Sequence, residues 1–212
     1  MLFIIGPLLV HLFAAIFQMS ASSYYHAFLC ESKERFIFLQ CMDFCGICLM
    51  ICGSTTSPFY YGFMCEENWF WGKVYLGQVW TFCIIALICT LCVDSKWVNA
   101  IAYIIAGYST VPGVWHLAYY TSEESLRIFV IWPWLVGGTT YAVGAIFYAL
   151  KFPERYFPRT FDIWLQSHTI FHLMIFAAAS LHIWGSFRVF HERQLFPCPE
   201  TGVVVTEPGH FT

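Results

Sequence analysis

Six long stretches of this chain contain few or no charged side chains. They are residues 1–29, 36–65, 74–93, 97–120, 128–150 and 161–187. A helix that crosses a bilayer needs about 20 mostly apolar residues, so each stretch is long enough for one crossing. A chain in lipid must satisfy its own backbone hydrogen bonds, and none of these stretches alternates in polarity as a barrel strand does. We therefore expect a bundle of six transmembrane helices.

The composition agrees with a membrane protein. Only 11% of the residues are charged, whereas a soluble domain has about 25%. The net charge is −3 and the sequence has no basic cluster, so we expect no nucleic-acid partner. We predict an all-α membrane protein whose helix bundle occupies residues 1–190 and is followed by a short tail outside the membrane at 191–212.

The basic residues predict the orientation of the bundle. Six of them lie in the links after the first, third and fifth stretches, and four lie on the opposite side. Because links that face the cytoplasm carry more Lys and Arg, the first set predicts the cytoplasmic side and places both ends of this chain outside. The first set is Lys33, Arg35, Lys96, Lys151, Arg155 and Arg159, and the second is Lys73, Arg127, Arg188 and Arg193.

The ten cysteines do not have the pattern of a disulfide framework, because most lie inside apolar stretches. Cys65 and Cys198 fall outside the expected helices on the same side, where a disulfide between them is one interpretation. Four others repeat at helical spacing over too long a stretch of helix to bind one ion, and we interpret them as small packing residues. These four are Cys41, Cys45, Cys48 and Cys52.

Three histidines are expected at one depth in the membrane. His168 and His172 are four residues apart, so they share one face of a helix. They lie two to three turns from the cytoplasmic start of the last stretch, and His26 lies near the cytoplasmic end of the first. Asp43 lies about two turns into the second stretch from the same side. At about 1.5 Å rise per residue, all four fall in the inner leaflet.

Three histidines at one depth match the ligands of a catalytic zinc ion, which keeps a fourth position open for water. An intramembrane carboxylate is costly unless it has a role, and Asp43 is placed to hydrogen-bond that water. Ser22, one turn before His26 on the same face, is placed to support the site or the substrate. The alternative is that the three histidines form hydrogen bonds that only hold helices together. The remaining intramembrane histidines, His11, His116 and His182, are interpreted as hydrogen-bonded packing residues.

These residues carry a resemblance to a known family. The segments SSYYHAFLCES (22–32), MDFCGICLMICGS (42–54), PFYYGFMC (58–65) and PERYFPRTFDIWLQSHTIFHLMIFAAASLHIWG (153–185) resemble the progestin and adipoQ receptor family, which includes the hemolysin III-like proteins. The adiponectin receptors are the more similar branch. The family's Ser-x-x-x-His, Asp and His-x-x-x-His motifs correspond to Ser22 and His26, to Asp43, and to His168 and His172.

The resemblance implies a seven-helix bundle with zinc bound by the three histidines near the inner leaflet and contacted by the aspartate through water. On this resemblance the six stretches correspond to helices two to seven of the family. The sequence is then expected to lack the first helix, with an incomplete gene model, an isoform and a true truncation as the alternatives. It also implies a receptor for an adiponectin-like protein or a steroid, with zinc-dependent hydrolysis of the amide bond of a ceramide-like lipid. The plasma membrane is the expected location, with the Golgi apparatus and endoplasmic reticulum as alternatives. The rival hypothesis is a receptor or scaffold without enzymatic activity, in which the zinc is structural.

Overall fold

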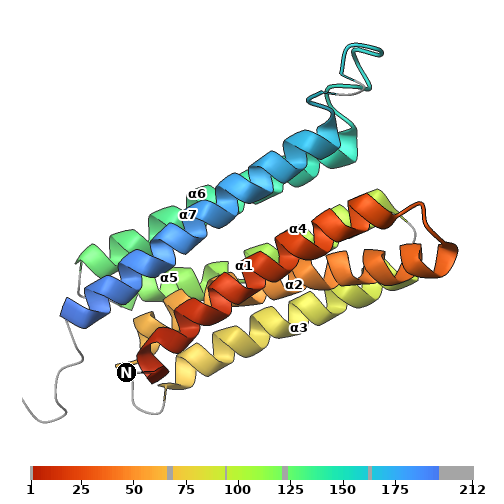
Figure 1. Ribbon diagram of the computed structural model, residues 1–212. Coiled ribbons are helices and arrows are strands. Elements are labelled where there is room, and N and C mark those ends of the chain that lie inside the picture. Colours follow the sequence, from red (N-terminus) through yellow and green to blue (C-terminus); the bar gives the residue numbers. More distant parts are fainter. Residues whose placement is uncertain (1, 66–68, 94, 121–123, 162–163, 196–212) are drawn as a thin grey trace, which may run out of the picture.

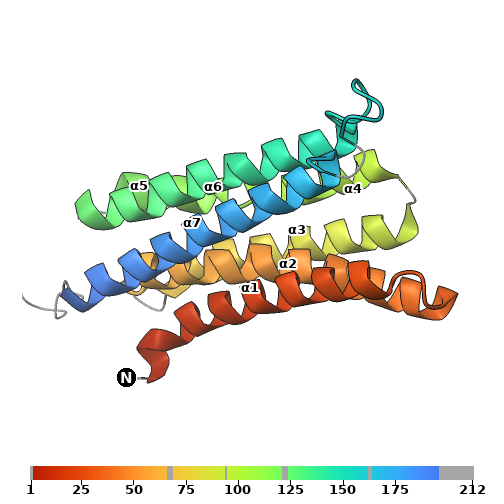
Figure 2. The same cartoon turned by 45° about the horizontal axis from the view of Figure 1, so that its top comes forward.

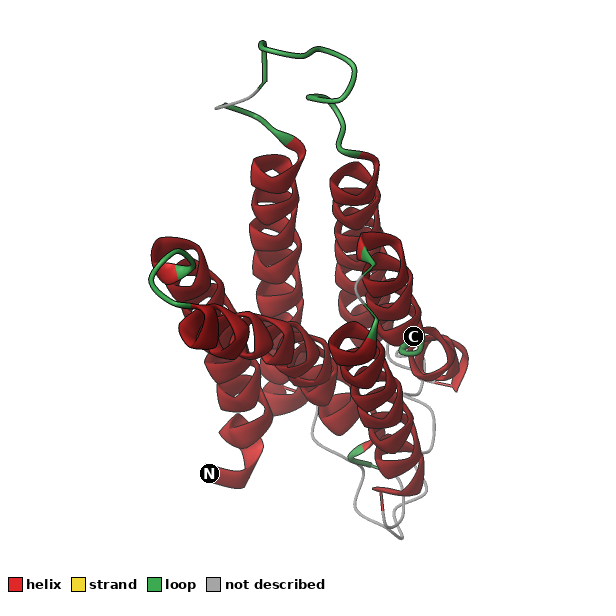
Figure 3. Cartoon of the chain, turned by 90° about the vertical axis from the view of Figure 1, so that its right-hand side faces the viewer, coloured by secondary structure: helices red, strands yellow, loops and turns green. Residues whose placement is uncertain are grey.

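The computed structural model describes residues 2–65, 69–93, 95–120, 124–161 and 164–195. Within this part of the chain all regular structure is helical (Figure 3). The helices are α1 (Leu2–Phe28), α2 (Lys33–Phe63), α3 (Phe70–Cys92), α4 (Lys96–Tyr108), α5 (Val111–Tyr120), α6 (Glu124–Leu150) and α7 (Ser167–Leu195).

Five of these helices, α1, α2, α3, α6 and α7, are long and apolar enough to cross a membrane. The predicted all-helical membrane bundle is therefore confirmed. The last helix begins later than expected, at Ser167, and continues to Leu195, so residues 191–195 of the predicted tail belong to α7. The rest of that tail lies outside the described residues.

The expected fourth span, 97–120, is divided into α4 and α5. Pro112 lies at the second position of α5, where its missing N–H costs nothing, whereas one unbroken helix would lose a hydrogen bond there. The turn satisfies its own polar groups: the Ser109 hydroxyl donates to the Ala106 carbonyl at 2.7 Å. Gln78 of α3 donates its amide N–H to the Ser109 carbonyl at 2.8 Å. The backbone can therefore leave the helix inside the bundle without exposing unpaired groups to lipid.

The helices are arranged around α2, which contacts every other helix. In Figures 1 and 2, α1 runs antiparallel beside α2, and α6 runs antiparallel beside α7. The contacts α2–α3, α3–α4 and α4–α6 continue around the bundle, and α7 closes it against both α1 and α2. The two ends of the sequence thus meet across the bundle, which is what brings His26 close to the start of α7.

The tightly packed core lies at the end of the bundle opposite the three histidines. Aromatic side chains at the C-terminal end of α2, including Phe59, Tyr61 and Phe63, are almost completely buried against α3, α5, α6 and α7. Nearer the middle of α2, Gly53 lets α1 approach closely, because a Cβ atom at this position would collide with Ala14. Small residues allow such contact between membrane helices.

Two of the links that carry the predicted cytoplasmic charges, α1–α2 and α6–α7, lie at the same end of the bundle in Figure 1. Cys65, beyond the opposite end of α2, is disulfide-bonded. Its predicted partner, Cys198, lies outside the described residues. The four cysteines at helical spacing on α2 are all free thiols, in agreement with a packing role.

Candidate metal centre

The ring nitrogens of His26, His168 and His172 converge at one point between α1 and α7. The Nε2 atoms of His26 and His168 are 3.0 Å apart, and those of His168 and His172 are 3.1 Å apart. One ring nitrogen from each residue lies within 4.8 Å of the other two. Two residues one helical turn apart and a third from the far end of the chain thus form one cluster.

This cluster has the geometry of a group that could hold a metal ion. Two nitrogens bound to one tetrahedral zinc ion at about 2.0–2.1 Å are about 3.3 Å apart, close to the separations found here. Each Nε2 atom of a neutral imidazole carries either one proton or one lone pair. Three such nitrogens cannot all be satisfied by hydrogen bonds among themselves, whereas one cation can accept all three lone pairs.

Tyrosine rings contact two of the three histidines. Tyr25 lies edge-on to His26, with ring centroids 5.0 Å apart. Tyr148 of α6 lies edge-on to His168 at 5.1 Å. His26 is exposed, while His168 and His172 are partly buried, so the cluster is reachable from outside the bundle.

Asp43 and Ser22 lie beside the histidine cluster. Asp43 projects from α2 into the same cavity and is close enough to His26 and Ser22 for electrostatic interaction. It is not a member of the convergent ligand group. The Ser22 hydroxyl is buried and makes no hydrogen bond of ordinary geometry with any other described residue. Both side chains therefore keep hydrogen-bonding capacity next to the point where the imidazoles converge.

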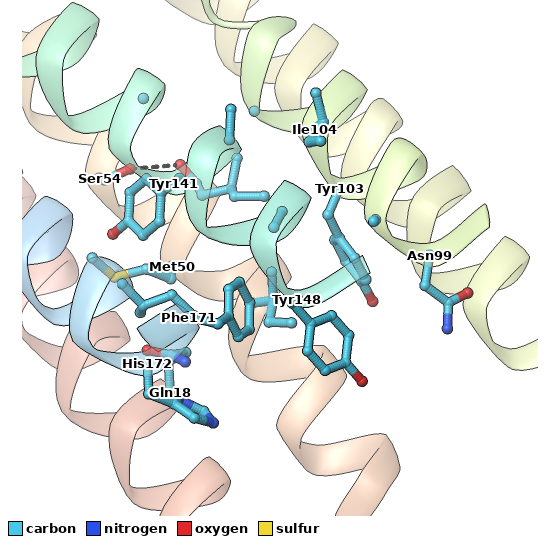
Figure 4. Close-up of a pocket in the computed structure, with 18 of the residues that line it drawn as sticks. Gln18, Met50, Ser54, Asn99, Tyr103, Ile104, Tyr141, Tyr148, Phe171 and His172 are labelled. Atoms are coloured by element: carbon cyan, nitrogen blue, oxygen red, sulfur yellow. Dashed lines mark hydrogen bonds between the residues drawn. The ribbon is translucent and has the colours of Figure 1, made fainter. Parts of the chain in front are cut away.

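A cavity of about 300 Å³ extends from the histidine cluster into the bundle. Its wall is formed by α1, α2, α4, α5, α6 and α7 and is mostly apolar. Figure 4 shows Met50, Phe171 and Tyr141 beyond His172, along the wall of this cavity. A volume of this size lies at the lower end of the range for small-molecule sites.

Sequence reasoning missed two tyrosines at the site. Tyr25 and Tyr148 both line the cavity and interact electrostatically with Asp43. Tyr25 directly precedes His26, which is a signal that the sequence offered. Nothing in the pattern of α6 distinguishes Tyr148 from the other aromatic residues of that helix.

Glu154, in the link between α6 and α7, is a second residue that the sequence did not single out. Its carboxylate accepts a hydrogen bond from the Ser167 backbone N–H at 2.7 Å and another from the Ser167 hydroxyl. Partial burial acts to raise the pKa of Glu154, but these hydrogen bonds outweigh it and hold the pKa below its ordinary value. Glu154 thus caps the N-terminus of α7 at Ser167, the residue that directly precedes His168.

We expect Glu154→Ala to destabilise the protein by about 1 kcal/mol at pH 7, as loss of a helix cap does. The folded-state pKa is the lower one, so the stabilisation is complete above the ordinary glutamate pKa of about 4.3 and is lost as the pH falls through the lowered value. Unfolding temperatures in detergent across this pH range test the effect. Glu31→Ala, at an exposed carboxylate paired with Arg35, is the control. A wild-type-like unfolding temperature for Glu154→Ala at pH 7 would contradict the capping role.

The structure does not bring the other histidines to the cluster. His11 is hydrogen-bonded to Ser186 at 2.8 Å, and His116 to Tyr75 at 2.9 Å, which confirms the predicted packing role for these two. His182 differs, because neither ring nitrogen makes a hydrogen bond of ordinary geometry within the described chain. His191 lies in α7, and His210 lies outside the described residues.

A family model for haemolysin-III related proteins matches residues 5–183. The chain belongs to this family. The Adiponectin receptor protein of Drosophila melanogaster is 34% identical over 183 residues, covering 81% of the chain and 39% of that protein. The Progestin and adipoQ receptor-like protein 1 of Caenorhabditis elegans is 30% identical, covering 87% of the chain and 44% of that protein.

Plants contain similar proteins. The Heptahelical transmembrane protein 5 of Arabidopsis thaliana is 29% identical, covering 83% of the chain and 48% of that protein. This haemolysin-III related chain thus spans less than half the length of each of these three relatives. The resemblance predicted from its motifs is confirmed, and the chain is a multi-pass integral membrane protein of the adiponectin and progestin receptor-like type.

Proposed function

We propose that this chain is a multi-pass membrane receptor that binds zinc and hydrolyses the amide bond of a ceramide-like lipid. One observation carries the proposal: His26, His168 and His172 converge at the mouth of a cavity that also contains the carboxyl group of Asp43. An open three-histidine set beside a carboxylate is the arrangement of a hydrolytic zinc site rather than of a closed structural one.

Zinc held by the three histidines would activate a water molecule and polarise the amide carbonyl. Asp43 acts as general base and accepts a proton from the attacking water. As the new C–O bond forms and the C–N bond breaks, Asp43 passes this proton to the leaving nitrogen. The Ser22 hydroxyl lies close to Asp43 and would orient its carboxyl group by donating a hydrogen bond to it. The products are a sphingoid base and a free fatty acid, which together account for the lipid and one water molecule.

The lipid reaches the site from the bilayer. Tyr108, Val111 and Leu135 line the cavity, yet they are 47%, 39% and 47% exposed on the outside of the bundle. The cavity therefore opens sideways between the α4–α5 turn and α6. An apolar chain can enter there without crossing water, and its amide then lies toward the histidine cluster.

The names of the relatives suggest the class of signal. One relative is named as an adiponectin receptor protein and another as a progestin and adipoQ receptor-like protein, so we propose an adiponectin-like protein or a steroid as the ligand that acts on this chain. The excess of basic residues in the links near the histidines supports a zinc site at the cytoplasmic side. We propose the plasma membrane as its location, with the Golgi apparatus and the endoplasmic reticulum as alternatives.

The rival function is a receptor or scaffold without enzymatic activity, in which zinc only ties α7 to α1 and α2. It is favoured by the position of the cluster, because His26 lies at one end of α1 and the other two histidines lie at the adjoining end of α7. The exposure of His26 and the adjoining cavity favour hydrolysis instead.

The decisive experiment measures release of fatty acid from a short-chain ceramide by purified protein in detergent. We expect release that is abolished by a zinc chelator and restored when zinc is added back. Zinc-loaded, folded protein that binds the lipid without cleaving it would refute the hydrolase and leave the receptor with structural zinc.

A further inference from the structure

A second group of buried polar side chains lies at the far end of the cavity. Trp134 of α6 and His182 of α7 both line the cavity wall. His182 is 14 residues beyond His168 on the same helix, which corresponds to about 21 Å along the axis. This group is therefore separate from the candidate metal centre.

Polar atoms of this group make no hydrogen bond of ordinary geometry within the described part of the chain. They are the Trp134 indole N–H, the Tyr141 hydroxyl and both ring nitrogens of His182, whose ring also interacts with the Trp134 backbone. His182 and Trp134 are 5% and 6% exposed. A buried polar group that makes no hydrogen bond destabilises the folded protein, so several of them in one place indicate a missing partner.

The rings of this group are held rigidly. His182 stacks on Trp134, with ring centroids 5.1 Å apart and planes 11° apart. Tyr141 meets the His182 ring edge-on at 5.5 Å. Gly137 makes room for the imidazole, because a Cβ atom there would collide with its Nε2 atom. The donors and acceptors are thus fixed in place before anything binds.

Ordinary helix packing does not account for this arrangement. His11 and Ser186 show how a buried polar pair between α1 and α7 is normally completed, with a hydrogen bond of 2.8 Å. His182 is one turn from Ser186 and close to His11, but it has no such bond.

The cavity between its two polar ends is apolar in character. The hydroxyls of Ser54 and Thr55, which line it, already donate to carbonyls of their own helix. Met50 and Phe171 form part of the remaining wall (Figure 4). A ligand that fills this space needs an apolar chain between two polar groups.

We propose that Trp134, Tyr141 and His182 form a subsite for a hydroxyl or carbonyl group at the far end of an acyl chain. The proposal deepens the proposed function and rests on it, because the other polar group of the ligand lies at the histidine cluster. A hydroxyl group suits the subsite well, since it can accept a hydrogen bond from the indole N–H and donate one to an imidazole nitrogen. Its preferred ligands are chain-hydroxylated fatty acids and lipids that contain them.

The test compares the binding of palmitate and ω-hydroxypalmitate to the zinc-loaded, detergent-solubilised chain by equilibrium displacement of a fluorescent fatty acid. An extended palmitoyl chain has about the length of the span between the two polar groups. We expect ω-hydroxypalmitate to bind about tenfold more tightly, the effect of one well-made buried hydrogen bond. Laurate and ω-hydroxylaurate, which are too short to reach the subsite, should bind alike.

Two substitutions localise the effect. Tyr141→Phe and His182→Phe keep an aromatic ring but remove the polar atoms, so each should reduce the preference for ω-hydroxypalmitate. Tyr24→Phe, at an exposed tyrosine of α1 outside the cavity, should keep it. Equal binding of the two palmitates by wild-type protein would overturn the subsite while leaving zinc binding and hydrolysis intact. Failure of both to bind, or an undiminished preference in both variants, would also overturn it.

Discussion

Replacing His172 with alanine is expected to reduce bound zinc from about one ion per chain to a trace. His172 supplies one of three convergent ring nitrogens, and its Nε2 atom lies 3.1 Å from that of His168. The two nitrogens that remain, on His26 and His168, come from different helices and no longer enclose the ion. Zinc content of protein purified in detergent, measured by mass spectrometry, gives the result directly.

The control for this variant is His182→Ala, which removes another histidine from α7 about 21 Å away along the helix. Its zinc content should equal that of the wild type. Helix content and elution volume should be unchanged in both variants, so that loss of zinc is not loss of fold. A full complement of zinc in His172→Ala would show that the three imidazoles are not the ligands, and would favour the interpretation in which they only hold helices together.

The spans could be predicted because lipid imposes a simple rule on sequence. Every residue of a crossing helix must be apolar or buried, so the gaps between charged residues mark the helices. The division of the fourth span could not be located in the same way. Residues 107–110 are only a short, uncharged interruption in an apolar stretch, and the end of α4 depends on Pro112 together with hydrogen bonds from Ser109 and Gln78. The bond from Gln78 forms only when α3 packs beside the turn.

The convergence of the three histidines could be predicted because each lies at a similar depth in the bilayer. The number of residues from the end of a helix, multiplied by the rise of about 1.5 Å per residue, gives that depth. The direction in which a side chain points around the bundle is not encoded so simply. Tyr148 and Trp134 lie on the face of α6 that meets the cavity, and this depends on which helices are neighbours. Glu154 contacts Ser167, 13 positions later in the chain, only because the link between α6 and α7 folds back. For the same reason His182 was interpreted as a satisfied packing residue, although its ring lies against a cavity and has no hydrogen-bond partner of ordinary geometry in the described chain.

Replacing Asp43 with asparagine is expected to lower kcat for ceramide hydrolysis by about 10²- to 10⁴-fold while zinc content stays at the wild-type level. Asparagine has nearly the same size and can still form hydrogen bonds, but it cannot accept and return a proton at neutral pH. Asp43 lies outside the convergent ligand group, so the substitution removes the base without removing a metal ligand. The rate of fatty-acid release and the zinc content must be measured on the same sample.

Glu34→Gln removes a carboxylate from the first turn of the same helix, outside the cavity, and should leave both quantities unchanged. Ser22→Ala should have a smaller effect than Asp43→Asn, because it loosens the carboxyl group that Asp43 needs for proton transfer but leaves that group in place. The order of the two effects tests the assigned roles of Asp43 and Ser22 better than either rate does alone. If Asp43→Asn kept its zinc and still cleaved the lipid at the wild-type rate, another group would have to transfer the proton. Tyr25 and Tyr148, whose side chains lie near Asp43, would be the next residues to replace.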